Sequence, residues 1–177
     1  MQSIVADTTP LNYLVLIQAA EILPNLYRKV LIPPAVKAEL AHANTPHIVR
    51  SWISQAPSWL EVVNLKQPVD SALSHLDAGE REAISLASEL QASLLLMDER
   101  DGVAMARHRG LTVIGTLAAL DLAAVRGLID LLTMFDRLRA TTFRSPLRLM
   151  VSMLEQDAER KKRQEGGPEY GGPSNAG

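Results

Sequence analysis

Hydrophobic and polar positions follow two alternating patterns along the chain. Short apolar segments, each stopped by a polar residue, a glycine or a proline, predict strands over residues 3–6, 29–32, 59–63, 93–97 and 112–114. Between these segments the apolar residues recur every three or four positions, which predicts amphipathic helices. Strands that alternate with helices form a parallel sheet with helices on both faces. The pattern therefore predicts an α/β protein with three layers, α/β/α, around a five-stranded parallel sheet.

Capping and breaking residues set the limits of the predicted helices. Thr9 suits an N-cap and Pro10 the first helical position, while Pro24 is expected to break a short helix and Gly110 to end another. We expect helices over residues 10–17, 20–27, 34–43, 46–56, 80–90, 101–109, 117–125, 128–138 and 146–163.

Length and composition fit one domain with a real hydrophobic core. The chain has 177 residues, of which 47% are hydrophobic and 21% charged, as in a compact globular protein. We expect a single domain over residues 1–163, with its core over 3–125 and C-terminal helices over 127–163. Residues 164–177, rich in glycine, proline and serine, are expected to form a disordered tail.

Several classes of protein are disfavoured by composition. No apolar stretch approaches the roughly 18 residues that a membrane helix needs, and the sequence contains no cysteine. We expect no signal peptide, because no basic segment followed by an apolar one begins at Met1. We therefore expect a cytoplasmic protein without membrane contact. The net charge of −2 argues against a broad nucleic-acid-binding surface, and the basic run 160–163 is interpreted as a solvated helix end.

Acidic residues stand where strands end and helices begin. Asp7 follows the segment 3–6 and Asp98 follows 93–97, so both lie at carboxyl ends of predicted parallel strands, where ligands of α/β sheets usually bind. Glu80 follows a predicted turn at Gly79 and lies in the first turn of a helix, and Glu39 lies on the helix after the second strand. By position alone Asp7 is equally well explained as a helix cap, and an isolated glutamate such as Glu39 is more often solvated.

If these four carboxylates meet, they require a cation. Like charges a few ångströms apart repel each other and raise each other's pKa, so such a cluster persists mainly when a metal ion neutralises it. Oxygen ligands select hard ions, Mg²⁺ or Mn²⁺. A zinc site is disfavoured because the four histidines are scattered along the chain, at 42, 47, 75 and 108.

Three segments resemble a known family in order and spacing. They are Val-Ala-Asp-Thr-Thr-Pro-Leu at 5–11, Ile-Pro-Pro-Ala-Val-Lys-Ala-Glu-Leu at 32–40 and Leu-Asp-Ala-Gly-Glu-Arg-Glu-Ala-Ile-Ser-Leu-Ala at 76–87. With these segments the sequence resembles a PIN domain, more narrowly the VapC-related branch, from Ser3 to about Leu154. The resemblance implies a PIN-like five-stranded fold and a metal-dependent ribonuclease. It assigns Asp7, Glu39, Glu80 and Asp98 to the acidic quartet of the family.

The resemblance is uneven around the third acid. Typical relatives carry aspartate where this chain has Glu80, and Glu82 competes for the same role, although Glu80 fits the following segment better. The secondary candidates are Thr8, which matches the hydroxyl residue after the first aspartate, Asp101, one helical turn after Asp98, and Thr116. Substrate phosphate is expected to contact Arg100 and Arg107, with Arg109 as a further candidate; all three arginines are equally plausible as surface residues.

The resulting functional hypothesis is an endoribonuclease. One or two Mg²⁺ or Mn²⁺ ions would activate water for hydrolysis of an RNA phosphodiester. Within the family, the toxin of a type II toxin–antitoxin pair is favoured, with a small antitoxin protein as partner and a homodimer as assembly. The helices over 128–138 and 146–154 either supply these contacts or form core. The alternative is a PIN-like module that binds RNA or protein without cutting it.

A third class, phosphatases and receiver domains, is disfavoured. The relevant phosphatases need a second acid where Thr9 stands, and a receiver needs a lysine after the last strand, where Gly115 and Thr116 stand.

Overall fold

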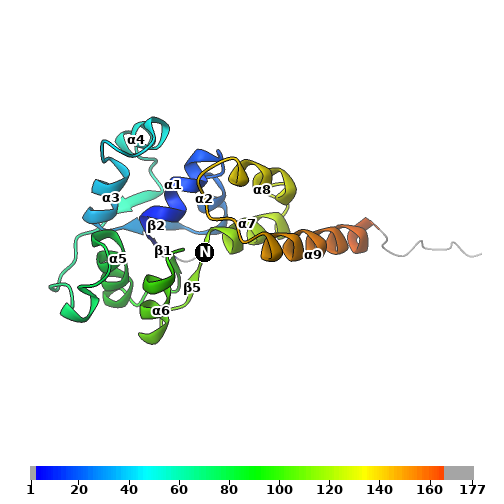
Figure 1. Cartoon of the computed structure of the whole chain (residues 1–177). Helices are drawn as coiled ribbons and strands as arrows, with labels where there is room; N and C mark the ends of the chain where they lie inside the picture. The colour runs from blue at the N-terminus through cyan, green and yellow to red at the C-terminus, as the bar shows by residue number, and fades with distance from the viewer. Residues whose placement is uncertain (1–2, 166–177) are drawn as a thin grey trace, which may run out of the picture.

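The computed structural model describes residues 3–165, which form a five-stranded parallel sheet between layers of helices (Figure 1). Each strand pairs with its neighbours in parallel, in the order β3-β2-β1-β4-β5. The strands are β1 (Ser3–Ala6), β2 (Lys29–Ile32), β3 (Leu60–Val62), β4 (Leu95–Leu96) and β5 (Val113–Ile114). The predicted α/β fold with five parallel strands is confirmed.

Helices connect successive strands and cover both faces of the sheet, with α1 and α4 on one side and α5 and α6 on the other in Figure 1. The helices are α1 (Thr8–Leu16), α2 (Ile22–Leu26), α3 (Pro34–Leu40), α4 (His47–Ser54), the 3₁₀ turn η1 (Ser71–Leu73), α5 (Ala78–Glu89), α6 (Arg100–His108), α7 (Thr116–Val125), α8 (Leu131–Arg139) and α9 (Leu147–Glu165). No helix in the described range is long and apolar enough to span a membrane.

The boundary between β1 and β4 is the point at which the order of the strands reverses direction across the sheet. From β1 the chain continues outward through β2 and β3, then returns to the other side of β1 with β4 and β5. Neighbouring strands β1 and β4 are in register, with Val5 opposite Leu95 and Ala6 opposite Leu96. The connections after these two strands diverge, which opens a crevice at their carboxyl ends. Asp7 follows β1 and Asp98 follows β4.

The predicted elements are all present, but several of their limits were wrong. Helix α1 begins at Thr8, and the N-cap is Asp7 rather than Thr9. Pro24 does not break α2, because it is the third residue of that helix, and the first turn needs no amide donor from it. Gly79 is not a turn residue: it lies inside α5, whose N-cap is Asp77.

The ends of several helices also differ from the predicted limits, as three examples show. Helix α3 ends at Leu40 instead of residue 43. Helix α8 begins at Leu131 instead of Leu128, because the Asp130 side chain accepts a hydrogen bond from the Thr133 backbone and caps the helix there. Helix α9 continues to Glu165, past the predicted limit at 163. The remainder of the predicted tail, 166–177, lies outside the described residues.

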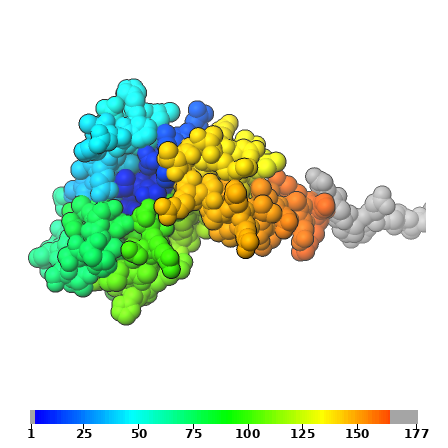
Figure 2. Space-filling view, viewed as in Figure 1, coloured from blue at the N-terminus to red at the C-terminus, as the bar shows by residue number. Residues whose placement is uncertain are grey.

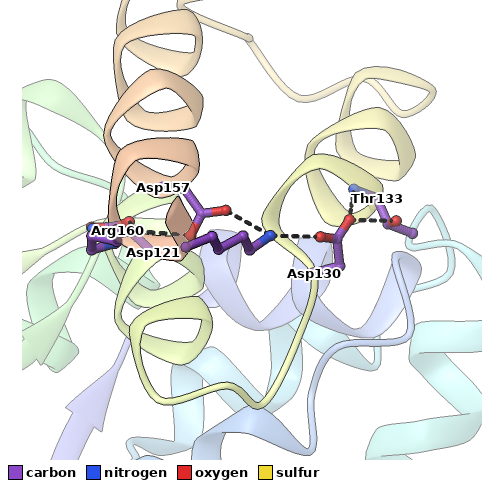
Figure 3. Close-up of polar contacts among 6 residues, drawn as sticks. Asp121, Asp130, Thr133, Asp157 and Arg160 are labelled. Carbon is purple, nitrogen blue, oxygen red and sulfur yellow. Dashed lines mark hydrogen bonds and ion pairs between the residues drawn. The ribbon is translucent and has the colours of Figure 1, made fainter. Parts of the chain in front are cut away.

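Helices α7, α8 and α9 pack together into a lobe beside the sheet (yellow and orange in Figure 2). The basic run of α9 holds this lobe together instead of facing solvent throughout (Figure 3). Arg160 pairs with Asp121 of α7 at 2.7 Å and Lys161 pairs with Asp130 at 2.9 Å. Both cations also pair with Asp157, whose side chain is buried. Lys161 is thus exposed, as predicted for a solvated helix end, but both cations are also ion-paired within the lobe, which the sequence pattern did not predict.

Candidate functional site

Asp7 is buried at the centre of the carboxyl edge, with 1% of its surface exposed. Its backbone donates to Leu96 of β4, which fixes it beside the neighbouring strand. Neither carboxylate oxygen has a hydrogen-bond partner. Burial raises the pKa of Asp7 well above its ordinary value, the nearby Thr8 backbone amide partly offsets the rise, and the charges of Asp77, Glu80 and Glu39 add to it. A buried acceptor without a donor is costly, so Asp7 requires either a proton or a cation.

Glu80 lies beside Asp7 at the start of α5. It forms a capping box with Asp77: Asp77 accepts from the Glu80 backbone at 2.8 Å, and the Glu80 carboxylate accepts from the Asp77 backbone at 3.4 Å. Burial and the Asp77 charge raise the pKa of Glu80 to about 7. A Cβ on Gly102 of α6 would lie 2.8 Å from the Met97 sulfur and 3.4 Å from the Glu80 carboxyl carbon, so this glycine mainly leaves space for Met97 and brings α6 into contact with Glu80.

Glu39 reaches the same cluster from α3. Its carboxylate accepts a short hydrogen bond from the Thr8 hydroxyl and a 2.7 Å bond from the Gly79 backbone. A side chain at Gly79 would collide with this carboxylate. The glycine of the Asp-Ala-Gly-Glu segment is thus needed for the close approach of Glu39 to α5, and Thr8 orients Glu39.

Asp98 stands across the crevice between β1 and β4, where α7 begins. It accepts from the Thr116 backbone at 2.8 Å and from the Thr116 hydroxyl at 2.6 Å. Burial raises its pKa, the two bonds from Thr116 partly offset this rise, and the Glu99 charge adds to it. The charges of Glu80 and Glu39 are among the causes that raise the pKa of Asp7. Asp98 follows β4, the strand that pairs with β1, and is held there by Thr116.

The other two acidic candidates do not join this group. The Glu82 carboxylate accepts from the Ala35 backbone at 2.9 Å, so it caps the start of α3. Asp101 lies in the first turn of α6 and is exposed. Of the two glutamates that compete in the central motif, the acidic cluster contains Glu80.

The cluster suits a hard divalent cation in its chemistry. All of its donors are oxygens, and the unpartnered buried oxygens of Asp7 are what such an ion would satisfy. Within residues 3–165, however, no group of three or more acidic, histidine or cysteine side chains is already arranged to hold a metal ion. Asp7 and Glu80 fit as ligands, while Glu39 and Asp98 are engaged in the hydrogen bonds described above.

Two cavities meet at Asp98, because this residue and Gly115 line both of them. The smaller, about 200 Å³, also contains Arg107. The larger is a groove of about 920 Å³, which contains Thr8 and Arg100. In Figure 2 the dark-blue segment of α1 is visible between the cyan, green and orange segments that line this groove. The third arginine candidate, Arg109, instead forms an ion pair with Asp70 at 2.6 Å.

Sequence reasoning missed two features of the site. The first is Asp77, which caps α5 and whose charge contributes to the raised pKa of both Asp7 and Glu80. Its position three residues before Glu80 is the signature of a capping box and was available in the sequence. The second is the segment 142–149, which lines the groove although it is far from the acids in sequence. No local signal could have placed it there.

Comparisons with known proteins identify one family. A family model described as "DUF3368: PIN domain" matches residues 3–159. Among solved structures, the chain is similar to a PilT N-terminus domain protein from the hyperthermophilic archaeon Sulfolobus solfataricus P2. The two are 20% identical, with a TM-score of 0.48 over 67% of this chain and 90% of the archaeal one. Comparison with curated proteins finds no match.

Proposed function

Because the chain belongs to the PIN-domain family described as DUF3368, we propose that it is a metal-dependent endoribonuclease that hydrolyses RNA phosphodiester bonds. PIN domains are generally nucleases. One observation carries the proposal for this chain: Asp7 is buried without a partner in the crevice between β1 and β4, among further carboxylates. An unpaired buried carboxylate is destabilising, so its presence there is best explained by a cation that binds during function.

In the proposed mechanism Asp7 and Glu80 hold Mg²⁺ or Mn²⁺ through their carboxylate oxygens. A bound ion of this kind lowers the pKa of water and neutralises charge on the scissile phosphate. Thr8 and Gly79 hold Glu39 in position, and Thr116 holds Asp98 on the opposite side of the crevice. Burial raises the pKa of Glu80 to about 7 in the protein without metal, so Glu80 is partly protonated near neutral pH and would have to be ionised to serve as a ligand. Arg100 and Arg107 line the two cavities and are proposed to contact substrate phosphates.

The decisive variant is Asp7→Asn, assayed by cleavage of labelled single-stranded RNA with Mg²⁺ or Mn²⁺ and with EDTA. We expect a loss of at least about a hundredfold in rate, because a ligand oxygen is replaced. The melting temperature should not fall, because a buried unpaired charge is removed. Asp136→Asn is the matched control, since Asp136 is an exposed residue of α8. An Asp7→Asn protein that cuts RNA at the wild-type rate would rule out the proposal.

A second candidate is a PIN-like module that binds RNA or protein without cutting it. Two observations favour it: the described residues contain no ready-made metal group, and Glu39 and Asp98 are already engaged by internal hydrogen bonds. Calorimetric titration with Mn²⁺ separates the candidates. Binding that is lost in Asp7→Asn supports the nuclease, and absence of binding supports the non-cutting module.

We also propose, at a finer level, the toxin of a type II toxin–antitoxin pair, which acts as a homodimer and is inhibited by a small antitoxin. This rests on the resemblance to the VapC-related branch. It is supported by exposed apolar residues in the C-terminal lobe, Leu132 on α8 and Leu147 and Val151 on α9. Other leucines of α8, such as Leu131 and Leu138, are buried in the core.

A further inference from the structure

We propose that the groove of about 920 Å³ holds a single strand of RNA beside the acidic cluster, with Tyr13 and Phe143 as a base-stacking platform and Arg144 as a phosphate contact. The inference rests on the proposed function and names the residues of this chain that would hold the strand. The groove contains Thr8 and Asp98, so a strand lying in it would pass beside residues of the acidic site.

The aromatic pair joins α1 to the segment between α8 and α9. The ring centroids of Tyr13 and Phe143 are 5.0 Å apart and the ring planes lie at 83°, an edge-to-face arrangement. In such a pair each ring keeps at least one face uncovered by the other. The Tyr13 hydroxyl also forms a 3.1 Å hydrogen bond with Thr142, which fixes the ring. The chain is only 4% aromatic, and two of these few rings line the groove.

The groove is lined by charges of both signs. Asp98, Glu99 and Arg100 come from the segment after β4, and Arg144 comes from the segment between α8 and α9. Within the described residues Arg100 and Arg144 have no carboxylate partner, in contrast to Arg109 and Arg160, which are paired. Two unpaired guanidinium groups in one groove suit successive phosphates of a strand.

Base stacking on the aromatic rings favours a single strand over a duplex as the occupant of the groove. Bases expose their faces to aromatic side chains only when they are unpaired, and such stacking tolerates any base. A peptide is disfavoured because it offers no anionic backbone to the two arginines, although Leu117 and Leu149 give the groove some apolar surface. Binding of a protein segment in place of RNA is therefore an outcome that would overturn the inference.

The test measures RNA binding in an Asp7→Asn background, where cleavage is blocked. Fluorescence anisotropy with a short labelled single strand should show that Tyr13→Leu with Phe143→Leu weakens binding about tenfold or more. Trp59→Leu is the matched control, because it alters the other aromatic pair, Trp52–Trp59, which does not line the groove. For the charge, Arg144→Gln is compared with Arg148→Gln, an exposed arginine four residues further along the chain that does not line the groove. Melting temperatures establish that each variant is folded.

A second readout separates stacking from loss of structure. A strand with one abasic nucleotide should bind more weakly at the stacked position, and this penalty should vanish in Phe143→Leu. In protein that retains Tyr13 and Phe143, the fluorescence of a 2-aminopurine base at the same position should be quenched on binding. Equal binding of duplex and single strand, or no position with such a penalty, would overturn the inference.

Failure of the inference and failure of the proposed function are distinguishable. If the wild type and the Tyr13→Leu, Phe143→Leu variant cut RNA at the same rate, the proposed nuclease stands and the stacking platform is rejected. If RNA binds with the expected abasic penalty and quenching but the wild type never cuts it, the stacking platform stands and the proposed nuclease is rejected.

Discussion

At the scale of residues, two glycines make room for two acids. A side chain at Gly79 would collide with the Glu39 carboxylate, and one at Gly115 would lie 2.5 Å from an Asp98 oxygen. Each of these carboxylates thus packs closely against the backbone of a glycine. Asp7 differs, because its buried carboxylate oxygens have no hydrogen-bond partner.

We predict that Glu80→Gln slows RNA cleavage whereas Glu82→Gln does not. Glu80→Gln removes a buried charge beside Asp7 and should slow RNA cleavage by about 10- to 100-fold or more. Glu82→Gln keeps an oxygen that can accept the Ala35 amide bond, so the rate should stay close to that of the wild type. Initial rates at saturating Mn²⁺ measure both. A larger loss for Glu82→Gln would reverse the assignment.

The raised pKa of Glu80 also predicts how stability depends on pH. The folded, metal-free protein binds this proton more tightly than the unfolded chain, because the pKa rises from 4.5 to about 7. Stability from this group is therefore greatest below about pH 4.5 and falls as pH rises to about 7; Asp7 acts in the same direction.

In EDTA, the melting temperature should therefore fall as the pH rises from about 5 to about 7.5. This range spans most of the interval between the ordinary pKa of Glu80 and its raised value. The slope should be smaller in Glu80→Gln and unchanged in Glu82→Gln. Saturating Mn²⁺ should reduce or reverse it, because the ion stabilises the ionised carboxylates. An Asp7→Asn, Glu80→Gln double variant with the full wild-type slope would show that other groups cause it.

At the scale of elements, helix N-termini surround the acids. Asp7 caps α1, the capping box of Asp77 and Glu80 begins α5, and Asp98 accepts from the first residue of α7. The positive ends of these helices favour negative charge nearby. Part of the repulsion within the cluster is thereby reduced even without a metal ion.

Another element-scale prediction concerns how α9 is anchored. Burial opposes ionisation of Asp157, but its bonds from Lys161 and Arg160 outweigh this and lower its pKa (Figure 3). Asp157→Ala leaves two cations without this partner, although each keeps a second one. We expect a loss of about 1–3 kcal/mol in the free energy of unfolding, measured with urea. Glu159→Ala, which removes an exposed pair, is the control and should have little effect.

At the scale of the whole molecule, two parts of the chain build the functional surface. The sheet supplies the acids at the crevice between β1 and β4, and the segment leading into α9 closes the groove beside them. The lobe of α7, α8 and α9 also carries exposed apolar residues on its outer surface. The proposed substrate binding and the proposed homodimer contact would therefore both depend on how this lobe packs against the sheet.

We predict that Leu147 and Val151 lie in the proposed homodimer contact. They are one helical turn apart on the same side of α9, and 57% and 53% of their surfaces are exposed. Leu147→Glu with Val151→Glu should convert a dimer to a monomer in light scattering without lowering the melting temperature of the monomer. Ile48→Glu, which changes an exposed apolar residue of α4, should leave the dimer intact. A monomeric wild-type protein would remove the homodimer from the proposal.

The sequence by itself determined the helices and strands and the position of acids at the ends of two strands. Local periodicity places strands and helices because it depends on neighbours a few residues apart, and acids after strands 3–6 and 93–97 point to the carboxyl edge once the sheet is parallel. Errors at helix ends, such as the start of α1 at Thr8, arise because a cap is decided by backbone geometry and competing side chains.

The tertiary structure alone decided which acids meet and what surrounds them. Glu80 joins Asp7 while Glu82 caps α3, although they are two residues apart, because successive side chains of a helix point to different sides. The bond between Thr8 and Glu39, and the approach of Phe143 to Tyr13, join residues far apart in sequence. Such contacts depend on the packing of whole elements, which local patterns do not encode.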